Sequence, residues 1–133
     1  MAETKLSPEQ ALPLPTARFK VIAATKDMTA ATADVAYTGV GFKPAAIIAI
    51  AAINGTIQYS NGMADAGLTT GNLYNAQAST NAYVDANFIS LWAAGGGNQA
   101  GTLKTLDSDG FTVTWTKYLS PTGTETMRFL CFR

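Results

Sequence analysis

The sequence predicts an all-β protein: an antiparallel β-sandwich or jelly roll of about eight strands, with an extended N-terminal arm. Apolar and polar residues alternate over short runs, and Gly, Pro and Asn turn residues recur about every 8–12 residues, as in sandwich domains. The chain has 133 residues, which suits one domain with one core. We therefore divide it into an arm of residues 1–17 and a β-sandwich domain of residues 18–133.

The arm differs in composition from the rest of the chain. It contains three prolines and three isolated leucines, without a sustained helical or strand period. Pro13 stops any helix within about one turn of its start, so a short turn followed by extended chain is expected. Spaced apolar side chains of this kind can lie across a neighbouring subunit. The candidate partner-binding residues are Leu6, Leu12, Leu14 and Phe19.

The domain opens with alternating residues. Over residues 18–25, Phe19, Val21 and Ala23 alternate with the residues between them, and we expect one face of this strand to be largely buried. A second alternating run over residues 32–38 leads into a Gly-Val-Gly sequence, where a bulge or bend is expected.

The run AAIIAIAAI at residues 45–53 is ambiguous by periodicity, because alanine favours helix and isoleucine favours strand. Its context favours a strand. The run is short, it follows Pro44, and Asn54-Gly55 comes directly after it, which is a strong hairpin signal. Residues 56–60 are expected to return antiparallel.

The second half is less uniform. Residues 61–82 are rich in glycine and predict a long loop or two short strands, and residues 83–92 predict one strand. A hairpin follows, with its turn at residues 107–110 and the Phe111 and Trp115 side facing the core. A mostly apolar final strand ends at the C-terminus.

Charge is scarce and unevenly placed. Nine basic and nine acidic residues give zero net charge, so composition gives no support for binding nucleic acid or anionic lipid. Between Lys43 and Lys104 the charged residues are Asp65 and Asp85 alone. Charge normally keeps exposed surface solvated, so this stretch predicts an oligomer or assembly interface. The alternative is a monomer with an uncharged polar face.

The chain offers little for catalysis or cofactor binding. It has no histidine, which removes the commonest general base and metal ligand. The single cysteine, Cys131, lies among apolar residues and is expected to pack rather than react. Asp107 and Asp109 are the close carboxylate pair, but they flank a predicted turn. We expect no enzyme activity, no cofactor and no metal site.

No membrane or secretion signal is expected. The longest apolar run, residues 45–53, has nine residues, whereas a membrane-spanning helix needs about twenty. The N-terminal residues lack the hydrophobic stretch of a signal peptide. The chain is therefore expected to stay in the cytosol where it is made, or to leave it inside a particle.

A second possibility is carbohydrate binding by exposed aromatic rings beside polar groups. The central region holds three tyrosines near asparagines, although each is more often a core or interface residue. The candidate glycan contacts are Tyr59, Tyr74, Asn75 and Tyr83.

The segments TGVGFKPAAII, from Thr38, and DGFTVTWTK, from Asp109, resemble a small β-sandwich module of tailed-bacteriophage virion proteins, found in tail-fibre tips and head-associated proteins. That module is similar in shape to H-type lectins, which associate as trimers. The resemblance implies a non-enzymatic virion protein, made in the bacterial cytoplasm, that decorates or cements the capsid. Its expected partners are itself, as a homotrimer, and the major capsid protein or another virion protein. The alternative is a tail-fibre or baseplate module that recognises host-surface glycan.

Overall fold

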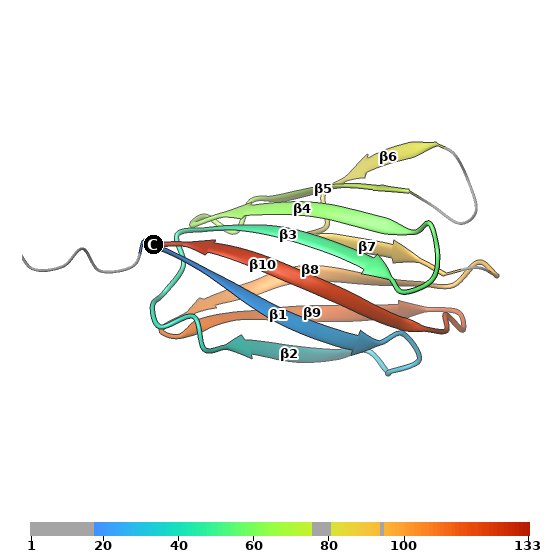
Figure 1. The fold of residues 1–133 in the computed structure, drawn as a ribbon, viewed down its shortest axis with the longest axis horizontal. Coiled ribbons are helices and arrows are strands. Elements are labelled where there is room, and N and C mark those ends of the chain that lie inside the picture. The colour runs from blue at the N-terminus through green and yellow to red at the C-terminus, as the bar shows by residue number, and fades with distance from the viewer. Residues whose placement is uncertain (1–17, 76–80, 94) are drawn as a thin grey trace, which may run out of the picture.

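The computed structural model describes residues 18–75, 81–93 and 95–133, so the predicted arm lies outside the described part. Two antiparallel sheets pack face to face (Figure 1). No helix of membrane-spanning length and apolarity occurs among the described residues. The six-stranded sheet has the order β1 (Phe19–Asp27), β10 (Thr124–Phe132), β3 (Ala46–Ile53), β4 (Tyr59–Asp65), β5 (Thr70–Asn75), β6 (Ala82–Asp85). The four-stranded sheet has the order β2 (Ala33–Thr38), β9 (Gly110–Tyr118), β8 (Asn98–Asp107), β7 (Ile89–Trp92).

The predicted antiparallel β-sandwich is confirmed, with ten strands in the described residues where about eight were expected. The return strand expected over residues 56–60 starts later, at Tyr59, and continues as β4 into the glycine-rich region. That region also contains β5, and its residues 76–80 lie outside the described part. The single strand predicted over residues 83–92 is wrong, because the chain crosses from one sheet to the other between β6 and β7. Asp85 stabilises the segment between β6 and β7. Its carboxylate accepts hydrogen bonds from the Asn87 amide at 2.8 Å and the Ser90 hydroxyl at 2.9 Å.

Aromatic side chains from both sheets fill the core. Tyr37 and Phe111 come from the four-stranded sheet, Phe129 from the six-stranded sheet, and Phe88 from the crossing between them. Their ring centroids lie between 4.9 and 6.3 Å apart in stacked, tilted and edge-on pairs, the arrangements that aromatic rings prefer. Trp115 is fully buried beside them, and its indole nitrogen donates to the Tyr37 hydroxyl at 3.0 Å.

A carboxylate joins the β8–β9 turn to the chain that leaves β2. The backbone amides of Gly39 and Gly41 donate to the Asp109 carboxylate at 3.1 and 2.6 Å, and the Val40 amide donates to the Asp109 carbonyl at 3.2 Å. The turn sits so close to β2 that a Cβ at Gly110 would lie 1.9 Å from a backbone carbonyl oxygen. The segments that begin at Thr38 and Asp109 are therefore bonded to each other.

Apolar and polar residues alternate in β1, but its largest apolar side chains face outward rather than toward the core. Phe19 and Val21 point outward and are 62% and 53% exposed, whereas Ile22 and Ala24 point toward the core and are only partly buried. The expectation of a largely buried face is therefore wrong for this strand. The reason is its position: β1 is the edge strand of its sheet, so its inward face is covered incompletely.

Replacing Asp109 by alanine removes the acceptor of two backbone amides. We expect Asp109→Ala to lower the free energy of unfolding by about 2 kcal/mol, since hydrogen bonds to a charged group contribute about 1.5–3 kcal/mol. Urea denaturation measures the change. Ser108→Ala, in the same turn, is the control and should change stability by less than about 0.5 kcal/mol. Equal effects of the two substitutions would contradict the role of the Asp109 carboxylate.

Candidate functional site

The outer face of the six-stranded sheet is covered with large apolar side chains. Seven of the twelve large hydrophobic residues that are exposed in the described chain point outward from this sheet, so the exposure is concentrated rather than scattered. Contiguous exposed apolar surface of this kind marks interaction sites. We call this surface the apolar face, and its residues are Phe19, Val21, Ile48, Ile50, Met63, Leu73, Val84 and the half-buried Leu130.

Strand register sets these side chains in rows across the sheet. One row runs through Val21, Leu130, Ile48 and Met63. The neighbouring row runs through Ala23, Arg128, Ile50, Asn61, Leu73 and Val84. Directly opposed side chains on adjacent strands lie close enough to touch, so each row is a continuous band.

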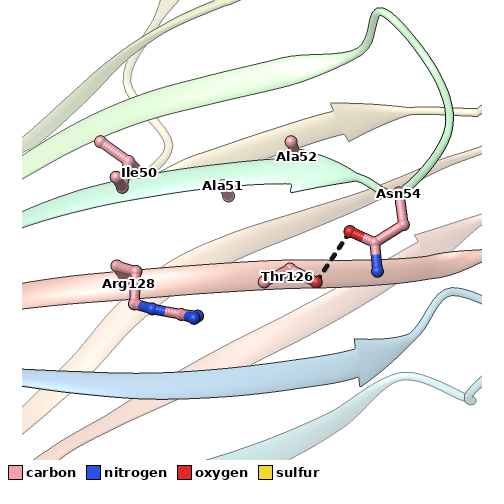
Figure 2. Close-up of a pocket in the computed structure, with 6 residues that line it drawn as sticks. All are labelled: Ile50, Ala51, Ala52, Asn54, Thr126 and Arg128. Atoms are coloured by element: carbon pink, nitrogen blue, oxygen red, sulfur yellow. Dashed lines mark hydrogen bonds between the residues drawn. The ribbon is translucent and has the colours of Figure 1, made fainter.

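The apolar face carries one charge away from the strand ends. Among the described residues at outward positions, Asp27 and Asp65 stand at the ends of β1 and β4, and Arg128 stands in the middle of β10. Its guanidinium donates to the Met127 carbonyl at 2.9 Å and points away from Ile50 (Figure 2). Its aliphatic stem therefore adds to the apolar cover.

Shallow grooves run between the rows. A groove of about 440 Å³ is lined by Val21, Ile48, Ile50, Arg128 and Leu130. A second, of about 380 Å³, continues along β3 and β10 to the hydrogen bond of 2.8 Å from the Thr126 hydroxyl to the Asn54 side chain (Figure 2). A third lies at the Met63, Leu73 and Val84 end of the same face. The face is hollowed, so it suits side chains inserted from a partner.

The outer face of the four-stranded sheet has a different chemistry. Threonines of β9 line it, and Asp34 of β2 accepts from the Thr114 hydroxyl at 2.6 Å and forms an ion pair with Lys104 of β8. The hydrogen bonds from Lys104 and Thr114 lower the pKa of the Asp34 carboxyl. This face is polar and suits water, so the two outer faces of the sandwich are not equivalent.

The four candidate glycan residues are only partly brought together. Tyr74 and Tyr83 stack across β5 and β6 with ring centroids 5.7 Å apart, and Asn75 follows on β5 and is buried. Trp92 hydrogen-bonds the Tyr74 hydroxyl, and burial raises the pKa of that tyrosine. Tyr59 precedes the buried Ser60, which pairs with Tyr74, so alternation places Tyr59 on the opposite face of the sheet.

Of the candidate arm contacts, Phe19 is described and the other three are not. Phe19 begins β1 beside Phe132 of β10 and belongs to the apolar face. Leu6, Leu12 and Leu14 lie outside the described residues. The arm therefore joins the domain at a corner of the apolar face.

The ionisable groups inside the sandwich are enclosed. Glu125 is fully buried, neither of its carboxylate oxygens has a hydrogen-bond partner among the described residues, and burial raises its pKa to about 8. Lys26 faces it across β1 and β10, with its ammonium 5.0 Å from the centre of the Trp115 ring, and burial lowers its pKa. Burial also raises the pKa of the Cys131 thiol to about 11.

No protein-family model, curated protein or solved structure matches the chain.

The sequence predicted an interface in the charge-poor stretch, which stays a prediction, and it did not indicate which face of the six-stranded sheet is apolar. The missed residues include Ile48, Ile50, Met63 and Arg128. A signal was present in β3, where both the odd and the even positions are apolar, which is the pattern of a strand covered on both faces. The buried Glu125 had no comparable signal, because its strand alternates like its neighbours.

Because the Glu125 carboxyl is buried, the free energy of unfolding falls as the pH rises. The folded state favours the neutral form, so the contribution of Glu125 to the free energy of unfolding is complete below its ordinary pKa of 4.5 and is lost as pH rises through about 8. The facing groups are Lys26 and the Tyr37 hydroxyl. Glu125→Gln should be more stable than the parent at pH 8 by at least about 1.4 kcal/mol, the free energy of one pKa unit. Urea denaturation from pH 5 to 8 tests this, and parallel profiles for parent and variant would contradict it.

Proposed function

We propose that this protein is a non-enzymatic structural protein of a bacteriophage virion that decorates or cements the capsid and acts as a homotrimer. The observation that carries the proposal is the apolar face: a contiguous, grooved, nearly uncharged surface on one side of the sandwich. Exposed surface of this kind favours association with other protein over exposure to water.

The arrangement supports assembly rather than small-molecule chemistry. The apolar face spans six strands, about 24 Å at the usual strand spacing. Aliphatic side chains make up much of the lining of its grooves, beside Arg128 in one groove and Asn61 and Asn72 in another, and such a lining suits protein side chains. The buried Glu125 and Cys131 are fully enclosed and do not contact solvent.

The virion setting rests on the sequence resemblance. The residues that carry it, from Thr38 and from Asp109, surround the clamp that Asp109 makes with Gly39 and Gly41. The resemblance therefore falls on residues that hold the sandwich together. On a capsid lattice, many copies each making a modest apolar contact would be retained strongly, because multivalent attachment multiplies weak single contacts.

Binding to capsids tests this function. The purified protein, mixed with capsids that lack it, should co-sediment to a fixed copy number. Ile50→Lys, which sets a charge in the apolar face and so disturbs the homotrimer that attaches to the capsid, should weaken binding by about tenfold or more, equivalent to about 1.4 kcal/mol. Thr116→Lys, an exposed position on β9 of the opposite sheet, is the matched control and should bind as the parent does. Absence of saturable binding by the parent would overturn the virion assignment.

The second candidate is glycan recognition at a tail-fibre tip or baseplate, favoured by the stacked pair Tyr74 and Tyr83. Tyr83 is 42% exposed, so part of its ring is open to a sugar. On this alternative, Tyr83→Ala abolishes binding to host-surface glycan in a glycan array, while Ile50→Lys retains it. Retention by Tyr83→Ala, or no glycan binding by the parent, would exclude this site.

A further inference from the structure

We infer that the apolar face binds the N-terminal arm, residues 1–17, of a neighbouring copy of this chain, with Leu6 and Leu12 in its grooves and Glu9 opposite Arg128. This inference rests on the proposed function, because it names the partner that covers the assembly surface. It makes arm exchange between copies the contact that forms the oligomer.

The grooves and the arm have matching chemistry. The central groove is lined by four aliphatic residues, Val21, Ile48, Ile50 and Leu130, together with Arg128. Leucines at positions 6, 12 and 14 supply aliphatic side chains spaced by proline and polar residues. Spaced apolar side chains on an arm gain contact when they are laid into a preformed groove.

Charge complementarity places the arm over Arg128. Arg128 is the charged residue in the middle of the apolar face, and its exposed guanidinium uses one nitrogen on a backbone carbonyl. Glu9 stands midway between Leu6 and Leu12, and a polyproline II backbone, with three residues per turn, would turn all three side chains to the same side. Two apolar faces packed directly on each other about a twofold axis would instead bring two arginines toward one another.

The length and origin of the arm fit this contact. Seventeen extended residues span at most about 56 Å, more than twice the width of six strands. β1 begins beside the C-terminus, at an end of the apolar face (Figure 1). The Arg133 amide donates to the Arg18 carbonyl at 2.9 Å, which ties the residue that follows the arm to the C-terminal residue.

The arm sequence favours a neighbouring copy over the face of its own domain. Pro13 and Pro15 restrict Leu12 and Leu14 to extended backbone, and the segment has no glycine to make a sharp reversal before β1. We therefore place the arm on a neighbouring copy. A head-to-tail contact between an arm and a different surface closes into a ring, such as a trimer, where the rotation between copies closes.

Cross-linking between full-length chains tests the contact. Leu12→Cys and Ile50→Cys chains are co-expressed and treated with a short bis-maleimide, which joins two thiols. We expect a product of about 28 kDa, twice the chain mass of 13.9 kDa. Cys131 is fully buried, so the parent chain should give no product. Thr102→Cys, exposed on β8 of the opposite sheet, replaces Ile50→Cys as the matched control and should give none with Leu12→Cys.

Two results would overturn the inference: no cross-link between Leu12→Cys and Ile50→Cys chains, or equal cross-linking with Thr102→Cys. Cross-linking confined within single chains that carry both Leu12→Cys and Ile50→Cys would also overturn it, because the arm would then cover its own domain. Failure here with intact capsid binding removes arm exchange and leaves the proposed function. Cross-linking between copies without capsid binding supports arm exchange and removes the virion role.

A charge exchange gives a second, independent readout. Arg128→Glu should reduce the yield of the cross-linked product at least threefold by opposing Glu9. Adding Glu9→Arg to the same chain should restore the yield, since the pair is then present with its signs reversed. A reduction that Glu9→Arg does not reverse would overturn the placement of Glu9 opposite Arg128.

Discussion

The central strands β3 and β10 carry apolar side chains on both faces, and this constraint governs the rest of the molecule. On the inner side, Ile47, Ala49 and Phe129 pack against the four-stranded sheet and form the core. On the outer side, Ile48 and Ile50 meet no residue of the described chain that covers them. The same run of residues therefore builds the sandwich and leaves an exposed apolar surface on its outer side.

Two acidic side chains, Asp109 and Glu125, make polar exceptions to the largely apolar packing of the sandwich. The Asp109 carboxylate satisfies backbone amides at the bend after β2, so the bend needs no further secondary structure. Glu125 is buried opposite Lys26, where burial holds its carboxyl in the neutral form at pH values below about 8. Buried groups of this kind reduce stability but also restrict the packing to one register.

Much of the fold could be predicted from the sequence because strand alternation and turn residues are local signals. The Asn54-Gly55 turn and the hairpin around Asp109 lie where their residues indicated. The break between β6 and β7 could not be predicted, because the change of sheet depends on contacts of Phe88 with distant strands. Likewise, periodicity in β1 gives two faces but not which of them is inward; that is decided by pairing with β10 at the sheet edge. The charge-poor stretch predicted an interface, but the arrangement of the exposed apolar residues on one face required the register of five strand pairs.

The central claim is that the apolar face is a contact surface between copies of this chain. The most direct measurement is the mass of the purified full-length protein by light scattering over a range of concentrations. The account predicts a stable species of about 42 kDa, three times the chain mass of 13.9 kDa. A particle of the single-chain mass at every concentration would contradict it, because the apolar face would then be tolerated in water.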